Sequence, residues 1–425
     1  MNSYYFLCSK FSDLDNMLPV LHKLLEKDDQ SKSVILWYGK SISSNSLNLI
    51  NYVRSIHDGR EIYFFSSISP GIVKDELNKF QKIKYYTRKL IQEITKRVLL
   101  KYDSKKELTI ANAISKRIID DNLNNKNSFN VFFFGFKGRR ILDIISRNVQ
   151  NGHKIWVRLP QGVRLTINAF RTEDDLFKPS SPDNYIPDWA DVGIDVDRHM
   201  YDKVSQIRKT LGHNEAQSKK IKLLGAPRFS REWIAHLDIA YQNQKSSFAV
   251  FDNNRSNVLF LLTPWQKNVW KDEVLRVMQI ISYYDVNLVI KGFHGNTKLP
   301  INQYSFVIDE KTPSSALIRD ADAIIFIATS VALEGYVRGK EMLQLSYVHG
   351  NQTILEDNNM GVMAHCRDDV HLFVNNLVRK SIFSLDLKVK QNAETFVVNN
   401  IVGTDPMNAY AEHIMYLSEQ YRNPV

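Results

Sequence analysis

The sequence has few of the features that mark secreted, membrane-spanning or cysteine-ligated metal proteins. It contains only two cysteines in 425 residues, Cys8 and Cys366, and neither lies in a redox motif or at the spacing of a metal site. No apolar run approaches the roughly 20 residues of a membrane-spanning helix, and no signal-peptide pattern begins the chain. We therefore expect a cytoplasmic protein in a reducing compartment, with both cysteines buried as small apolar side chains.

Motifs of nucleic-acid recognition are also missing. The sequence has no zinc-finger spacing, no helix-turn-helix signature and no single-strand-binding motif. The formal net charge is nevertheless +10, from 56 Lys and Arg against 46 Asp and Glu. We expect an anionic partner other than nucleic acid, either a phosphorylated substrate or an anionic membrane surface.

The basic residues are concentrated in one segment. Nine of them lie between Lys82 and Lys106, against two acidic residues, and apolar residues recur among them at helical spacing. Such a basic amphipathic helix can lie on anionic lipid, which predicts peripheral contact with the inner face of the cytoplasmic membrane. The pattern fits equally a helix whose apolar stripe packs on its own domain.

Strand-like and helix-like segments alternate along nearly the whole chain, and no internal repeat interrupts them. Near-continuous apolar strands separated by helices predict parallel sheets that are covered on both faces. The expected strands lie within residues 4–9, 33–39, 61–67, 130–136, 154–160, 257–264, 287–293, 322–330 and 341–347.

The length of the chain and a break in its pattern predict two domains. A single core rarely serves 425 residues, and the proline-containing, polar stretch 171–220 resembles a connection. We expect an α/β fold of two Rossmann-like domains that face a central cleft. Residues 1–220 would form the acceptor-side domain and 221–403 the nucleotide-donor domain, while a C-terminal helix in 404–425 crosses back to the first.

Polar side chains follow three predicted strands of the second half, at the points where those strands end. Thr263 follows the first, Lys291 and His294 the second, and Thr329 and Ser330 the third. Ligands of open α/β sheets bind beyond the carboxyl ends of the strands, so these residues are predicted to converge on one donor-binding site.

The segment TSVALEG indicates how a nucleotide would be held. Ser330 stands where a strand turns into a helix, and it can both cap that helix and bond a phosphate oxygen. Glu334 lies one turn further on the same helical face, where a carboxylate suits the hydroxyls of a ribose. Lys291 and His294 can donate to a diphosphate or to an anionic sugar. An N-cap serine followed by a surface glutamate is the alternative interpretation.

Two further sites near the second domain are ambiguous. Arg228 follows a Gly-Ala-Pro turn, from which it can reach a phosphate across the cleft or lock the linker by bonding backbone carbonyls. Ser314 or Ser315 is expected to cap the next helix.

In order and spacing, these segments resemble the C-terminal domain of GT-B glycosyltransferases of bacterial surface polysaccharide biosynthesis. LLGAPRF resembles their G-x-P-R segment, LVIKGFHG their K-x-H-P segment, and residues 320–345 their S-S-x-x-x-E and G-K-P segments. The similar enzymes are capsule Kdo-transferase-like proteins, bacterial sialyltransferases and CDP-glycerol glycerophosphotransferases. The likeness spans about residues 221–370. This sequence has Phe293-His294-Gly295 at the H-P pair, Thr329-Ser330 at the S-S pair and Glu341 at the proline.

The resemblance implies a metal-independent glycosyltransferase without a cofactor. It would move a sugar from a nucleotide-activated donor, a CMP-linked acidic sugar being favoured over UDP or CDP donors, to a surface glycan or lipid-linked acceptor. Donor binding would use the strand-end residues, Glu334 and Arg228, with His294 also catalytic. A UDP-sugar 2-epimerase-like enzyme and a non-catalytic GT-B scaffold in polysaccharide assembly are the alternatives.

The residues that the resemblance implies for acceptor binding lie in the first half of the sequence. A first-domain base would activate the acceptor hydroxyl, and Asp13 is preferred because the loop after the first strand commonly faces the cleft. Asp13 can equally cap a helix beginning near Leu14, and Asp15, His57 and Asp58 are other candidates. In LPQGVR, Gln161, Gly162 and Arg164 are predicted to bind the acceptor, with a simple turn as the alternative.

Overall fold

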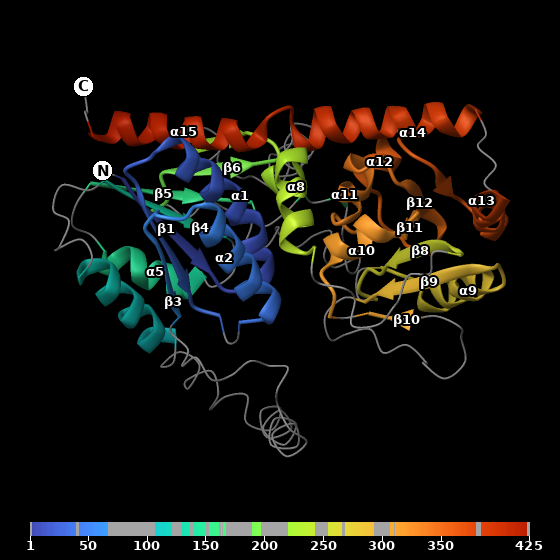
Figure 1. Cartoon of the computed structure of the whole chain (residues 1–425), viewed down its shortest axis with the longest axis horizontal. Helices are drawn as coiled ribbons and strands as arrows, with labels where there is room; N and C mark the ends of the chain where they lie inside the picture. The colour runs from blue at the N-terminus through green and yellow to red at the C-terminus, as the bar shows by residue number, and fades with distance from the viewer. Residues whose placement is uncertain are drawn as a thin grey trace, which may run out of the picture.

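The computed structural model contains two parallel sheets with helices packed against them (Figure 1). The basic segment 82–106 lies outside the described residues. The structure describes residues 2–39, 42–66, 107–120, 129–135, 139–149, 153–160, 163, 165–166, 189–196, 220–242, 254–265, 268–292, 307–309, 311–379 and 384–422.

The first sheet has seven strands in the order β3-β2-β1-β4-β5-β6-β7, and every adjacent pair is parallel. Aromatic and β-branched residues dominate its central strands, and every residue of β2 and β4 is buried, as a sheet covered on both faces requires. The strands are β1 (Asn2–Cys8), β2 (Lys32–Trp37), β3 (Ile62–Ser66), β4 (Phe129–Phe134), β5 (Lys154–Arg158), β6 (Val192–Asp195) and β7 (Ile221–Leu223).

Amphipathic helices cover this sheet. In α1, Leu14, Leu18, Leu21 and Leu25 recur at a spacing of three to four residues and are buried in the same core cluster as Phe133 of β4. The helices of the first domain are α1 (Phe11–Lys27), α2 (Ser44–Ile56), residues 107–120 and α5 (Arg139–Asn148).

The second sheet has six strands in the order β10-β9-β8-β11-β12-β13, again all parallel. Its strands are β8 (Ser256–Leu261), β9 (Val286–Lys291), β10 (Val307–Ile308), β11 (Ala323–Phe326), β12 (Glu341–Leu345) and β13 (Met363–Ala364). Its helices are α9 (Lys271–Ser282), α10 (Ser314–Asp320), α11 (Ala332–Val337), η6 (Ser346–Val348), α12 (Ile354–Asp357), α13 (Arg367–Arg379) and α14 (Ser384–Phe396).

Both sheets reverse their strand order at one point. The chain winds outward from β1 through β2 to β3 and then continues from β4 on the other side of β1, and β8 to β11 repeat this plan. The reversal between β1 and β4, and between β8 and β11, is the topological switch point of a doubly wound sheet, where ligands of such folds bind.

The connection between the domains begins later than residue 220, because β7 extends the first sheet to Leu223. It continues through η4 (Pro227–Phe229) into α8 (Arg231–Ala240), which lies between the two domains (Figure 1). Trp233 and Leu237 of α8 are buried in the first core, whereas Phe229 is buried in the second.

The chain returns to the first domain at its C-terminal end. After α14 come a π-helical stretch, η7 (Val397–Val402), and α15 (Pro406–Arg422), so that α14 and α15 run along the same side of both domains (Figure 1). Met407, Tyr410 and Ile414 of α15 are fully buried in the core of the first domain.

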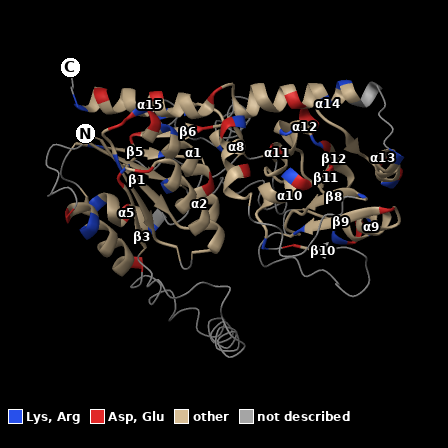
Figure 2. Ribbon diagram, in the orientation of Figure 1, with Lys and Arg blue, Asp and Glu red and all other residues tan. Residues whose placement is uncertain are grey.

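Some sequence expectations are wrong in detail. Helix α1 begins at Phe11, three residues ahead of Leu14 and shortly after β1 ends at Cys8. Cys8 is buried as expected, but Cys366 is exposed at the start of α13. Acidic and basic segments are interspersed on the helices of both domains (Figure 2). Among the described helices, none has the length and apolarity that crossing a membrane requires.

Candidate functional site

Three strand ends of the second sheet meet at its switch point. The Thr263 hydroxyl oxygen, just beyond β8, accepts a hydrogen bond from the backbone N–H of Ala328, beyond β11, at 3.2 Å. On the other side of β8, the Lys291 carbonyl accepts from the backbone N–H of Leu262 at 3.1 Å. Thr263, Lys291 and the half-buried Thr329-Ser330 pair are therefore grouped at one edge of the sheet, as its strand order requires.

Ser330 does not cap the helix that follows it. Helix α11 begins at Ala332, with Val331 in the N-cap position and no side-chain cap. The carbonyls of Thr329 and Ser330 instead accept from the N–H groups of Ala332 and Leu333, at 3.2 and 3.1 Å, in a tight turn. The capping expectation is wrong, because the turn delays the helix by one residue, and the two hydroxyls remain at the edge of the sheet.

Glu334 is a fully buried residue and not a surface glutamate. Its Oε2 accepts from the Ser315 hydroxyl at 2.9 Å and from Arg228 Nη2 at 3.1 Å, and its Oε1 accepts from Arg338 Nε at 3.0 Å. Both carboxylate oxygens are thus engaged within the protein. A ribose hydroxyl would replace or share one of these bonds, and the ribose-binding role stays a prediction.

Arg228 joins the two domains through carboxylates, not through backbone carbonyls. Its Nε donates to Asp15 Oδ2 of α1 at 2.6 Å, while its Nη2 faces Glu334 of α11. Burial alone would lower the pKa of Arg228, but Asp15 and Glu334 raise it above its ordinary value, so the guanidinium stays charged. Burial raises the pKa of the Asp15 carboxyl, against the opposing effect of Arg228. The buried Nη1 makes no hydrogen bond, and the donor-binding role of Arg228 stays a prediction.

The outer members of this network, Arg338 and Asp238, are not among the residues predicted from the sequence. Arg338 follows Glu334 by four residues, a helical pairing visible in the sequence, and its guanidinium also holds Asp238 of α8 at 2.7 and 2.9 Å. The contributions of Asp15 and Asp238 come from other helices, and no sequence spacing indicates them. We call these five residues the interdomain ion chain: Asp15, Arg228, Glu334, Arg338 and Asp238.

The side chains of Lys291 and Ser315 are both bonded to other residues of the protein. The Lys291 ammonium is buried and donates to the Thr312 carbonyl at 2.5 Å. Asp309 fixes that loop by accepting from the N–H and the hydroxyl of Thr312 at 2.8 and 2.5 Å. Neither Ser314 nor Ser315 caps α10, whose N-cap residue is Pro313. The capping expectation is wrong because the Ser315 hydroxyl is bound to Glu334.

The candidates for a catalytic base lie in different places. Asp13 is buried in the first turn of α1, where its Oδ2 accepts from the N–H and the hydroxyl of Ser9 at 3.0 and 2.7 Å. The expectation that Asp13 caps the helix is wrong, because the N-cap residue is Lys10 and Asp13 lies inside the first turn. Its catalytic role stays a prediction. His57 ends α2 and Asp58 is exposed beside it, so both precede β3 at its amino end. Their role as a catalytic base stays a prediction.

Several predicted site residues lie outside the described part of the chain, namely His294, Gln161, Gly162 and Arg164. The residues beside the acceptor candidates are nevertheless placed. Val163 and Leu165 are buried in the core of the second domain, and the Leu165 carbonyl accepts from the N–H of Ile354 at 2.8 Å. This segment of the first half therefore crosses to the second domain.

An open hollow of about 460 Å³ lies beyond β12 and β13, lined by residues that include Ser346, Asn351 and Glu356. Behind it, the buried imidazole of His349 lies with Nε2 3.7 Å from Glu356 Oε1. Burial lowers the pKa of His349, and the Glu356 carboxylate only partly opposes this. The hollow opens at the same edge of the sheet as the Thr329-Ser330 pair, because β11 and β12 are parallel neighbours.

Away from this edge, His22, Glu232 and His236 offer ligand atoms that all lie within 4.8 Å of one another. Burial lowers the pKa of His22 to about 4, and the neighbouring His236 contributes. Two histidines and a carboxylate form a donor set that suits transition metals.

No protein-family model and no curated protein sequence matches the chain. Solved structures do match in fold. The UDP-GlcNAc 2-epimerase from Neisseria meningitidis bound to UDP-GlcNAc aligns with 99% of this chain and 100% of its own, at a TM-score of 0.55 and 12% identity. The UDP-GlcNAc 2-epimerase from Methanocaldococcus jannaschii gives the same four values.

A third match is the Anabaena protein HepE in complex with UDP-glucose, which covers 98% of this chain and 100% of its own at a TM-score of 0.54 and 10% identity. At these identities the likeness concerns the fold, and the resemblance to the surface-polysaccharide enzymes stays a prediction. The matches extend over the whole length of both chains and agree with the two doubly wound sheets. The chain has the GT-B fold, which consists of two Rossmann-like domains.

Proposed function

We propose that the chain is an enzyme that binds a nucleotide sugar at the carboxyl edge of the second sheet. The grouping of Thr263, Lys291 and the Thr329-Ser330 pair at the switch point between β8 and β11 carries this proposal. Hydroxyl and ammonium groups donate hydrogen bonds that the oxygens of a diphosphate accept. The hollow beyond β12 gives the sugar a neighbouring space at the same edge.

A uridine diphosphate sugar is the substrate class that we favour over a CMP-linked sugar. The solved structures with the same fold include complexes with UDP-GlcNAc, UDP and UDP-glucose. Glu334 does not distinguish the two classes, because a ribose is common to both and its carboxylate oxygens are bonded within the protein.

Among reactions on such a substrate, we favour isomerisation at the sugar over transfer to an acceptor. Four solved structures of this fold, with TM-scores of 0.52 to 0.55, are named as UDP-GlcNAc 2-epimerases or as putative ones. Glycosyl transfer is the second candidate, supported by the order of the G-x-P-R, K-x-H and T-S-x-x-x-E segments in the sequence.

Nucleotide binding is tested by a thermal-shift panel of UDP, CDP, CMP and GDP with the full chain. We expect UDP to raise the melting temperature most, because stabilisation grows with the ratio of ligand concentration to its dissociation constant. Ser330→Ala and Lys291→Met should reduce that rise, whereas Lys271→Met, on the exposed start of α9, should keep it. Equal shifts with all four nucleotides, or an unchanged UDP shift in both site variants, would refute the proposed site.

The reaction is tested by incubating the chain with UDP-GlcNAc alone and following the sugar protons by NMR. A new UDP-sugar that forms without any acceptor supports isomerisation. Free UDP that appears only when a glycan or lipid-linked acceptor is added would overturn that assignment in favour of transfer.

A further inference from the structure

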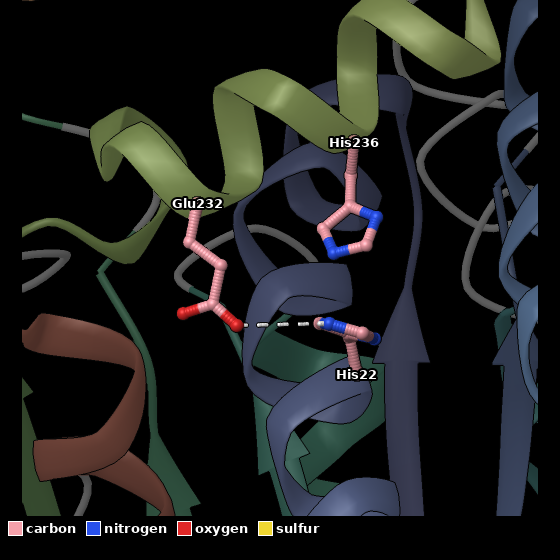
Figure 3. A group of neighbouring side chains, drawn as sticks. All are labelled: His22, Glu232 and His236. Atoms are coloured by element: carbon pink, nitrogen blue, oxygen red, sulfur yellow. Dashed lines mark ion pairs between the residues drawn. The ribbon is translucent and has the colours of Figure 1, made fainter.

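Two helices from different parts of the chain present matching pairs of ligand residues to each other. On α8, Glu232 and His236 are one turn apart, and on α1, His22 and Glu26 are one turn apart, so that each pair shares a helical face. The rings of His22 and His236 meet edge to face, with centroids 4.3 Å apart. Figure 3 shows Glu232, His236 and His22 turned toward one another from the two helices.

The outward-facing ring nitrogens of both histidines are already fixed by other residues. His22 Nδ1 lies 2.7 Å from His57 Nε2, and His236 Nδ1 lies 2.8 Å from the Tyr52 hydroxyl. Each ring therefore has its Nε2 left over, and that of His236 points toward His22 in Figure 3. Metal-binding histidines in proteins typically have their second nitrogen held in this way.

The Nε2 atom of His22 is the second observation that indicates a ligand. His22 is only 3% exposed, and its Nε2 makes no hydrogen bond. The nearest carboxylate oxygens are Glu26 Oε1 at 3.4 Å and Glu232 Oε1 at 3.9 Å. A buried polar atom without a partner costs free energy, so something other than these side chains is expected to bind it.

The net charge around these residues also favours the binding of a cation. Glu26 and Glu232 share one ammonium, that of Lys23, at 2.8 and 2.9 Å. One positive charge against two carboxylates leaves a net negative charge beside neutral imidazoles, which is an environment that favours a divalent ion.

We propose that His22, Glu232 and His236 bind a divalent transition-metal ion, zinc being the best fit to this donor set. This site is separate from the nucleotide-sugar site and goes beyond the proposed function. Its ligands come from α1 of the first domain and from α8, the helix that follows the interdomain connection. The ion fastens α8 to the first domain, and the fourth position of a tetrahedral site is left to water or to Glu26.

The distances between the ligand atoms match those of a tetrahedral zinc site once the side chains move slightly closer together. Zinc bonds of about 2.0 to 2.1 Å in a tetrahedron place neighbouring ligand atoms about 3.3 Å apart. The separation between His22 and Glu26 is 3.4 Å and that between His22 and Glu232 is 3.9 Å. Glu232 is half-buried on the accessible side of the cluster, so its side chain can move inward as the ion binds.

The test uses the untagged full chain, freed of metal with EDTA and then titrated with zinc against a chromophoric chelator. We expect one zinc ion to bind per chain and to raise the melting temperature. Glu232→Gln and His236→Gln should each weaken zinc binding at least about tenfold. Cobalt(II) in the same chain should give the visible absorption of a four-coordinate site.

Controls separate this site from adventitious zinc and from loss of folding. Exposed His365 and Cys366 are the obvious adventitious ligands, so the double variant H365Q/C366S should bind zinc as the original chain does. Tyr52→Phe keeps the helix and removes only the hydroxyl that orients His236, so it should weaken zinc binding while circular dichroism is unchanged. Unaltered affinity in both Glu232→Gln and His236→Gln, or binding that disappears in the double control variant, would overturn the proposal.

Discussion

Arg228 places a buried positive charge where the two domains meet. Its side chain is only 7% exposed, with carboxylates of the first and the second domain on either side. A buried ion pair adds little net stability over apolar residues, but the removal of one partner leaves an uncompensated charge in the interior.

We therefore expect Arg228→Met to lower the free energy of unfolding by about 3 to 5 kcal/mol, because Asp15 and Glu334 lose their common cation. Urea denaturation followed by circular dichroism measures this. In the matched control Lys27→Met, the lost ammonium pairs with Glu412 at the surface, and the change should stay within about 1 kcal/mol. Equal effects of the two substitutions would contradict this account of Arg228.

A buried histidine makes the second domain sensitive to mild acid. Because burial lowers the pKa of His349, the unfolded chain takes up a proton near pH 6.5 while the folded chain does not. The unfolded state then binds more protons, so the free energy of unfolding falls as pH decreases below about 6.5.

His349→Asn should reduce that loss. An asparagine oxygen can replace the ring Nδ1 that accepts from the N–H of Asn351 at 3.1 Å, but it does not titrate. Urea denaturation at about pH 8 and about pH 5 should show a smaller difference for the variant than for the original chain. A difference of the same size in both proteins would exclude His349 as a contributor.

At the residue scale, the sequence predicted positions better than contacts. The strand ends at Thr263, Lys291 and Thr329 were predictable, because apolar runs stop there and parallel strands end at a common edge. The burial of Glu334 was not, because it depends on Arg228 and Ser315, which lie 106 and 19 residues away. The pairing of His22 with His236 likewise requires two helices to meet, which no local pattern indicates.

At the scale of elements, two segments that run between the domains contact each other near Gly225 and Val402. Gly225 has a φ of +84° and lies close to the backbone of Val402, in the segment before α15. The next residue, Ala226, donates its N–H to the Val402 carbonyl at 2.7 Å. A Cβ atom at Gly225 would collide with that carbonyl. The connection therefore requires glycine for two reasons, the backbone conformation and the close packing.

Gly225→Ala should destabilise the protein by roughly 2 to 4 kcal/mol, which combines the cost of a left-handed alanine with that of the collision. Gly59→Ala is a control for the first cost alone, since φ there is +83° and nothing lies within 4 Å of the added Cβ atom. It should cost about 1 kcal/mol. Thermal denaturation of both variants measures the difference, and similar losses would show that the contact with Val402 has no effect.

Elements with strong periodicity or long apolar runs were the predictable ones. The nine strands expected from the sequence correspond to β1 to β5, β8, β9, β11 and β12. The other four strands, β6, β7, β10 and β13, have two to four residues each, which is too little pattern to recognise. Helix α11 begins where Ala332 follows a tight turn, and only backbone hydrogen bonds define that boundary.

At the scale of the whole molecule, the chain passes between the domains more than once. After the connection at Gly225, it returns through Gly403 into α15, and Val163 and Leu165 of the first half are buried in the second core. Tyr410 of α15 donates its hydroxyl to the Gly225 carbonyl at 3.0 Å and so links the two crossings. The first domain is therefore incomplete without the C-terminal end of the chain.

Truncation after Gly403 tests this dependence. It removes Met407, Tyr410, Ala411 and Ile414, all fully buried in the first core. At about 1.5 to 3 kcal/mol for each of the three large side chains, the loss approaches the 5 to 15 kcal/mol that stabilises a typical domain. We expect the truncated chain to lose its cooperative thermal transition. Truncation after Ser418 removes only exposed residues of α15, so that chain should keep the transition. A cooperative transition in the chain truncated after Gly403 as well would mean that the first domain folds without α15.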